Sequence, residues 1–442
     1  MDLLIPFFIA LFAGSLIFGA VYQKAPWKDA LSILVAFWLG MAGCTFVVFY
    51  SILITGRYEP LNVIVTTYIF LILSCLLCFY RQGKPFLCFE GTGGAYWFKF
   101  FLVILIAWML TNGLSHHNFY GDWDAWSLWN YRARYLVLSE SHWRDIFTYN
   151  TQGKNPCFLP YWIVFGWTWI GAQSYAFTFF TAQLLGLIVL ATVFFSILNL
   201  TKNEDASFLG AIWLASIPYF LTHSISQYAD VLTASLIVLN MMLLFRLYRQ
   251  RTRADAFILG LMLGIMSFCK EEGIISAFFM IFFLILLLRK NLEFYFPFCW
   301  GLILTLIPTI LVKWWMHTAP AGVNTLYFPY FVEWMRWAYI FQYFLYVLFK
   351  AFHGGIWIIP LALLVSRLFK PADVQDRLMT AFLMMFIAVF FLLYVLVSCP
   401  LSFKVTLRSS LPSICLALKV FKKSMVLAIR ACSSGKVFSV SG

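Results

Sequence analysis

Long apolar runs separated by short polar segments make up most of the chain. A membrane-spanning helix needs about 20 apolar residues, with roughly 17–25 allowed. Ten runs approach that length: 3–21, 31–53, 61–80, 97–113, 175–199, 207–222, 229–247, 273–288, 295–313 and 377–398. Four more are shorter or ambiguous: 157–172, 256–269, 338–367 and 409–421. Barrel strands would be about ten residues long and would alternate strictly, so these runs predict helices. We expect an all-α, polytopic α-helical membrane protein with about 12 transmembrane helices.

The composition excludes a water-soluble fold. Of 442 residues, 63% are hydrophobic and 11% are charged, whereas soluble domains run roughly 45–50% apolar and about 25% charged. A chain this apolar is not disordered either. The aromatic fraction of 20% suits a lipid-facing surface with interfacial belts.

The net charge of +13 would suggest nucleic acid in a soluble protein. Here the basic residues gather between apolar runs, as Arg246, Arg249, Arg251 and Arg253 do. That distribution is typical of cytoplasmic loops, so we expect no nucleic-acid partner. The ten cysteines form no zinc pattern and are interpreted as packing residues.

Basic residues near span ends also predict an orientation. Arg81 and the Arg246 region mark inner loops, and counting spans from them assigns each remaining loop a side. The count leaves 157–172 as a segment that does not complete a crossing, or as two part-crossings. It places three polar clusters on one outer face: 114–156, 223–230 and 270–272. Irregular polar backbone at membrane depth survives only when buried in protein or lining a wet cavity, so we expect a shared external cavity.

The domain organisation predicted from these runs is simple. Residues 1–398 form one multi-pass transmembrane domain, with 114–156 as its first external loop. Residues 399–442 are rich in Ser, Lys and Val and hold at most one weak span, so they form an atypical C-terminal segment. No internal repeat is visible, direct or inverted.

The most informative stretch begins at Gly121-Asp122-Trp123-Asp124 and continues through two arginines, Arg132 and Arg134. A helix from Asp124 would place Leu128, Arg132 and Leu136 on one face. Such a helix is amphipathic and suited to the membrane interface, with its acids where they suit the helix dipole. An N-cap followed by an interfacial Trp anchor explains the same residues, and the sequence leaves both readings open.

Four short motifs in this order resemble those of GT-C glycosyltransferases, polytopic enzymes that use sugars on polyprenyl phosphate. The nearest subgroup is the bacterial protein-mannosyltransferase-like and aminoarabinose-transferase-like enzymes. The resemblance covers roughly residues 97–290. Its motifs are Asp122-Trp123-Asp124, Lys154-Asn155-Pro156-Cys157-Phe158-Leu159-Pro160, Gln227-Tyr228-Ala229-Asp230 and Cys269-Lys270-Glu271-Glu272-Gly273. The prolines of the second motif are not adjacent, which departs from the family pattern.

The resemblance implies transfer of a lipid-linked sugar to an external glycan, lipid or protein acceptor. A carboxylate would act as general base on the acceptor hydroxyl, with Asp124 as the first candidate and Asp230 as the second. Asp122 would position the loop or hold a divalent metal ion together with Asp124, and no metal requirement follows from the sequence. The leaving phosphate needs cations, for which the candidates are Arg132, Arg134, Lys154 and Lys270.

Three further residues, His223, Glu271 and Glu272, are expected to line the cavity. The implied partners are a polyprenyl-phosphate-linked sugar and membrane lipids. The implied location is a bacterial inner membrane or a plasma membrane, with the active site on the external, periplasmic face.

Plainer interpretations compete with each of these roles. Asp230 fits an N-cap, Arg132 and Arg134 suit lipid headgroups, Lys154 suits a loop, and 270–272 suits a solvated turn. A multi-pass transporter or lipid flippase is the alternative function, but it predicts an internal repeat and paired broken helices, and no repeat is visible. A scaffolding membrane protein does not explain an external loop with acids and arginines.

Overall fold

The structure is a computed structural model. It describes residues 2–22, 30–81, 120–147, 156–288 and 291–317, with isolated positions between 100 and 111. The chain divides into two compact units, Met1–Val323 and Asn324–Gly442, and the described residues all belong to the first. The boundary predicted after residue 398 stays a prediction. The spans predicted at 338–367, 377–398 and 409–421 lie outside the described residues.

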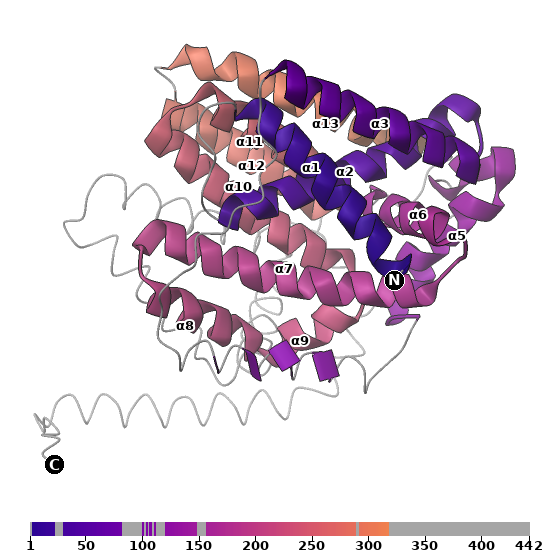
Figure 1. The fold of residues 1–442 in the computed structure, drawn as a ribbon, viewed down its shortest axis with the longest axis horizontal. Coiled ribbons are helices and arrows are strands. Elements are labelled where there is room, and N and C mark those ends of the chain that lie inside the picture. The colour runs from indigo at the N-terminus through magenta and orange to yellow at the C-terminus, as the bar shows by residue number, and fades with distance from the viewer. Residues whose placement is uncertain are drawn as a thin grey trace, which may run out of the picture. The chain divides into compact units, whose positions relative to one another are not determined.

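The described residues form helices and loops, with no strand among them (Figure 1). Seven of these helices are long and apolar enough to cross a membrane. They are α1 (Ile5–Val21), α2 (Ala30–Thr55), α3 (Pro60–Tyr80), α7 (Tyr175–Thr201), α10 (Ala229–Gln250), α12 (Glu271–Leu288) and α13 (Tyr295–His317). A polytopic helical membrane protein is thereby confirmed, whereas the count of about 12 spans stays a prediction.

Shorter helices fill the intervals between the long ones. They are α5 (Asn130–Leu138), α6 (Phe158–Ile170), α8 (Glu204–Ala215), α9 (Pro218–Ile225) and α11 (Arg253–Ser267), with short turns η1 (Asp2–Leu4), η2 (Ala125–Trp129), η3 (Glu140–Phe147) and η4 (Leu292–Phe294). The prediction of one span over 207–222 is wrong, because α8 and α9 are separate helices. Pro218 explains the break: it forces Ile217 into an extended conformation, which ends the preceding helix.

Glycines allow two pairs of helices to cross at backbone contact. A Cβ atom at Gly14 of α1 would lie 1.7 Å from the carbonyl oxygen of Ala36, and one at Gly40 of α2 would lie 1.6 Å from the α1 backbone. The same reciprocal arrangement joins α11 and α13 through Gly260 and Gly301. Small residues at helix crossings are typical of membrane proteins, where close packing replaces the hydrophobic effect between helices.

One end of the helical unit is fastened by a buried carboxylate. Asp255, at the start of α11, is fully buried and accepts Arg246 Nε at 2.8 Å and the Tyr22 hydroxyl at 2.5 Å on the same oxygen. The Thr252 hydroxyl donates to its other oxygen at 2.6 Å. These four residues join the ends of α1 and α10 to the start of α11, and we call this region the Asp255 end.

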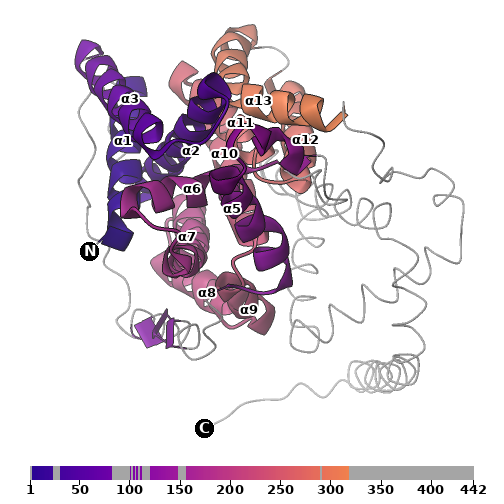
Figure 2. The same ribbon diagram turned by 90° about the vertical axis from the view of Figure 1, so that its right-hand side faces the viewer.

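Helix α6 begins and ends at the opposite end of the unit. The Phe158 N–H donates to the carbonyl of Phe268, after α11, with an N···O distance of 3.1 Å. Near the other end of α6, the Thr168 hydroxyl lies 2.9 Å from the hydroxyl of Tyr58, just before α3. Both partners lie away from the Asp255 end, because α11 and α2 each run away from it. Both ends of α6 therefore lie at one end of the unit, and Figure 2 shows α6 lying crosswise to α1. Its interpretation as an incomplete crossing stays a prediction.

Candidate active site

Two loops that are about a hundred residues apart in sequence dock against each other at this second end. The Ser226 hydroxyl donates to Asp122 Oδ2 at 2.5 Å, and the Asp122 N–H donates to the Ser226 carbonyl at 3.3 Å. Gly121 makes the approach feasible: its φ is +74°, and a Cβ atom there would lie 2.9 Å from the Ser226 oxygen. Only glycine adopts this conformation without strain while leaving room for the second loop. The first and second acidic motifs are thus held together by their backbones.

The helix after the first acids begins on the backbone of Asp122. Its carbonyl accepts the N–H groups of Ala125 and Trp126 at 2.9 and 3.2 Å. The chain then forms the π-helical turn η2 and continues as α5. Turns of π-helix are rare in proteins, and those that do occur are often found at functional sites.

The predicted helical face is present but is buried in protein. Leu128, Arg132 and Leu136 are 3%, 1% and 0% exposed, and α5 packs against α6. The interpretation of this face as lying at the membrane interface is therefore wrong. The exposed side of the segment carries Trp123 and Trp126, whose rings contact each other.

The two arginines of this helix point apart. Arg132 is buried, and its Nη1 donates to Cys157 Sγ at 3.6 Å, just before α6. Arg134 lies on the exposed side. Lys154 lies outside the described residues. The structure therefore brings Arg132, but not Arg134, toward the start of α6, and the predicted phosphate contacts of all three remain predictions.

Lys270 joins the second acidic motif to the turn between α11 and α12. Its Nζ lies 2.8 Å from Asp230 Oδ1 and 3.3 Å from Glu272 Oε1. Burial lowers the pKa of Lys270, but the two carboxylates outweigh it, so the pKa is raised above its ordinary value. Glu271 turns the other way and pairs with Lys313 Nζ of α13 at 2.8 Å. The three charges of this turn are therefore all paired.

Tyr228 lies among the three candidate acids. Burial raises the pKa of its phenol, a hydrogen bond with the Asp124 backbone lowers it, and the carboxylates of Asp122, Asp124 and Asp230 raise it further. All three carboxylates are therefore near enough to this phenol to interact with it electrostatically. We call Tyr228 with these three acids and Lys270 the acidic end.

The three acids differ in their partners. Asp122 accepts the Ser226 hydroxyl, and Asp230 is paired with Lys270. Asp124 is half-buried, and among the described residues no side chain or cation engages its carboxylate. In the same part of the chain, no group of three His, Cys, Asp or Glu residues is arranged to hold a metal ion. The divalent metal suggested for Asp122 and Asp124 stays untested, and no step below requires it.

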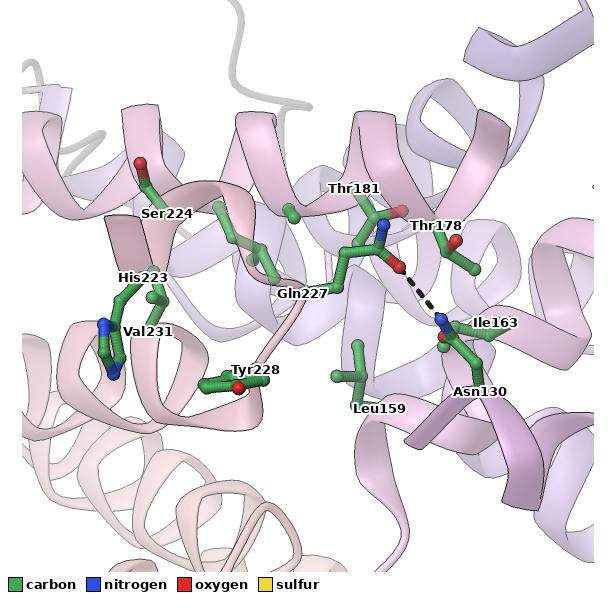
Figure 3. Close-up of a pocket in the computed structure, with 12 residues that line it drawn as sticks. Asn130, Leu159, Ile163, Thr178, Thr181, His223, Ser224, Gln227, Tyr228 and Val231 are labelled. Atoms are coloured by element: carbon green, nitrogen blue, oxygen red, sulfur yellow. Dashed lines mark hydrogen bonds between the residues drawn. The ribbon is translucent and has the colours of Figure 1, made fainter. Parts of the chain in front are cut away.

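A pocket adjoins the acidic end. Tyr228 and His223 form part of its wall, with their rings edge to face at a centroid distance of 5.5 Å. Across the pocket, Asn130 Nδ2 donates to Gln227 Oε1 at 2.9 Å (Figure 3). Glu271 and Glu272 are not among the residues that line this pocket, and the cavity role expected for them and for His223 stays a prediction.

Sequence reasoning missed Asn130, Ser226, Gln227 and Tyr228 as site residues. Three of them stand immediately before or within the Gln227-Tyr228-Ala229-Asp230 motif. Their polar side chains beside a candidate acid were a signal. Asn130 was also a signal in the sequence, because its polar amide stands at the start of a helix whose face is otherwise buried.

Comparison with known proteins bears on the family of this chain. Residues 154–315 match the family model of the dolichyl-phosphate-mannose-protein mannosyltransferases. This match supports a glycosyltransferase of the GT-C superfamily, so the resemblance drawn from the motifs is confirmed. The matched range contains Asp230 and Lys270 and begins after Asp122 and Asp124. No curated protein and no solved structure matches the chain significantly.

Proposed function

We propose that this protein is a multi-pass membrane glycosyltransferase that moves a sugar from a polyprenyl-phosphate carrier to a hydroxyl acceptor, with Asp124 as the general base. The family match supports the reaction class and a lipid-linked donor. The membrane spans support a donor that stays in the lipid. The site lies at the acidic end, which we place on the external face of a bacterial inner membrane or a plasma membrane.

The observation that carries the choice of base is the uneven engagement of the three acids. A general base must accept a proton, so its carboxylate must be available to the substrate hydroxyl. Asp122 and Asp230 are held by Ser226 and Lys270, at 2.5 and 2.8 Å. Asp124 has no such partner among the described residues. Asp230 then serves to hold Lys270, and Asp122 serves to fasten the loop.

The proposed sugar transfer accounts for every bond and proton with these residues alone. The acceptor hydroxyl gives its proton to the Asp124 carboxylate as its oxygen forms a bond to the sugar C1 atom. The bond between C1 and the phosphate oxygen breaks, and polyprenyl phosphate leaves with the electron pair. Asp124 then releases the proton to solvent or to the departing phosphate.

The leaving phosphate gains negative charge and needs a cation. Lys270 is the best-placed candidate, because its side chain is 17% exposed and its two carboxylate partners fix the ammonium beside the acids. Their raising effect on its pKa keeps it charged through the neutral range. Arg132 and Lys154 are further candidates near the start of α6.

The test replaces Asp124 by Asn in the full-length protein in membranes, with polyprenyl-phosphate-[14C]mannose as the first donor. We expect transfer to fall about 10²–10⁴-fold, the usual contribution of a general base. Asp145→Asn is the matched control, since it removes the same charge from an exposed position of the same loop region. Full activity of Asp124→Asn would show that another group takes the proton.

A further inference from the structure

The pocket beside Tyr228 contains a buried acceptor atom that has no donor. Asn130 is 3% exposed, and its Nδ2 donates both to Gln227 Oε1 at 2.9 Å and to the Tyr120 carbonyl at 3.1 Å. These two acceptors fix the orientation of the amide. Its Oδ1 is buried and has no hydrogen-bond partner among the described residues. Buried polar atoms are nearly always satisfied, and because Asn130, unlike the other described residues with such an atom, also lines this pocket, its oxygen can take a donor supplied from outside the chain.

The other buried hydroxyls of the pocket also present acceptors. The Thr178 hydroxyl donates to the Tyr175 carbonyl at 2.8 Å, and the Ser224 hydroxyl donates to the Leu221 carbonyl at 2.7 Å. Both hydrogens are therefore used within the protein, and lone pairs remain. The rest of the wall is largely apolar, including Leu159 and Ile163. A third buried hydroxyl of the lining, that of Thr181, accepts the Trp162 Nε1–H at 3.4 Å. A largely apolar pocket with a few amide and hydroxyl groups suits a neutral hydroxyl group, which both donates and accepts, better than a phosphate.

The size and position of the pocket define what part of a substrate it takes. Its free space is that of about one water molecule, so it holds a single hydroxyl group and not a sugar ring. Tyr228 separates it from the acids: the ring is part of the wall, and the hydroxyl is bonded to the Asp124 backbone. A group held there lies one side chain away from the proposed base.

We infer that this pocket, which we call the amide pocket, binds a second hydroxyl of the acceptor, next to the hydroxyl that reacts. The inference rests on the proposed function and sharpens it: the acceptor is a polyol, such as a glycan or a glycolipid headgroup. A serine or threonine side chain carries one hydroxyl and leaves the amide pocket empty. Asn130 is then a specificity-determining residue for the acceptor.

The first test compares acceptors in the full-length protein in nanodiscs, with polyprenyl-phosphate-[14C]mannose as donor. Octyl mannoside serves as the polyol acceptor, a Ser/Thr peptide as the single-hydroxyl acceptor, and release to water as the internal reference. We expect octyl mannoside to be used at least tenfold better than the peptide. In Asn130→Leu the ratio of octyl mannoside transfer to hydrolysis falls tenfold or more.

Asn240→Leu is the matched control for this variant. Asn240 is also a buried Asn whose Oδ1 has no partner among the described residues, but its amide bonds Leu236 and Met262 within the helices. We expect its transfer ratio to match the wild type. Equal use of the peptide, or an unchanged ratio in Asn130→Leu, would overturn the inference.

A second variant guards against misfolding of Asn130→Leu. Thr178→Val removes one acceptor of the amide pocket at nearly constant shape, and Thr45→Val loses the same kind of backbone bond in α2. Only the first should lower the transfer ratio, by about threefold to tenfold, corresponding to one hydrogen bond. An equal effect of both would also overturn the inference.

A binding measurement separates this inference from the proposed function. Methyl α-mannoside should raise the melting temperature of the wild type and of Asp124→Asn, and it should raise that of Asn130→Leu by less than half as much. An equal rise in melting temperature in the wild type and both variants would mean that the amide pocket binds water and not a sugar hydroxyl. If Asp124→Asn keeps full activity but these melting-temperature shifts are still observed, the amide pocket binds a hydroxyl group and Asp124 is not the general base.

Discussion

Two charged clusters stand toward opposite ends of α10, because Asp230 and Arg246 are 16 residues, or about 24 Å, apart along this helix. At the Asp255 end the carboxylate is fully buried and receives an arginine, a tyrosine and a threonine. At the acidic end the side chain of Asp230 is 45% exposed, and Asp124 has no partner among the described residues. Both ends hold acids and cations, but they are built for different purposes.

The two ends differ in how completely their carboxylates are engaged by hydrogen-bond donors and cations. Burying a charge costs several kcal/mol unless it is paired and hydrogen-bonded, and at the Asp255 end one cation and two hydroxyls donate to the carboxylate. Such a cluster has no capacity left for a ligand and acts as a structural fastening. At the acidic end the Asp124 carboxylate has no partner among the described residues, and Lys270, although paired with two carboxylates, is 17% exposed, so both groups can meet a substrate.

The largest expected effect on stability comes from breaking the Asp255 end. Asp255→Asn leaves Arg246, whose side chain is only 12% exposed, without a compensating charge, so we expect a loss of about 3 kcal/mol in the free energy of unfolding. Denaturant titration of the purified protein in detergent measures it. Asp124→Asn, which breaks no pair, should change the same quantity by less than about 0.5 kcal/mol. Similar losses in both variants would erase the contrast between the two ends.

A smaller effect on stability, and a larger one on activity, is expected from Lys270→Gln. The ion pair with Asp230 is partly exposed and contributes at most about 1 kcal/mol to stability. If Lys270 stabilises the leaving phosphate, kcat/KM for polyprenyl-phosphate mannose falls about 10²-fold. Lys202→Gln, at an exposed position after α7, is the control and should change neither quantity. A loss of several kcal/mol with normal kcat/KM would instead make Lys270 a structural residue like Arg246.

The sequence predicted much of the fold because membrane spans depend on length and hydropathy. The bounds of α2, α3 and α13 lie within a few residues of the predicted runs. The parity of basic loops set 157–172 apart from the full spans, and this run forms the short helix α6. The break at Pro218 was missed, because an average over the whole run 207–222 hides a single proline.

The candidate site was predictable in its acids but not in their partners. Asp122, Asp124 and Asp230 stand out as rare charges in an apolar chain. Which of them is engaged depends on Ser226 and Lys270, which are 104 and 40 residues away from their partners. Arg132 was expected at the interface because spacing gives a helical face, whereas tertiary packing decides whether that face meets lipid or protein.

The smallest expected effect is a difference between the two ends in how their contribution to stability depends on pH. The folded pKa of Lys270 is raised above its ordinary value of 10.5, mainly because the carboxylates of Asp230 and Glu272 outweigh burial. Its contribution to stability is therefore fully present below pH 10.5 and is lost as the pH rises through the folded pKa. The Asp255 end keeps its pair over the same range, because the Arg246 guanidinium stays charged. The difference in free energy of unfolding between wild type and Lys270→Gln, measured by denaturant titration, should be constant from about pH 7 to 10 and shrink at higher pH, with a total below about 1 kcal/mol. The difference between wild type and Asp255→Asn should not shrink there. If both stability differences declined in parallel above pH 10, the loss of stability at alkaline pH would come from the whole protein and not from Lys270.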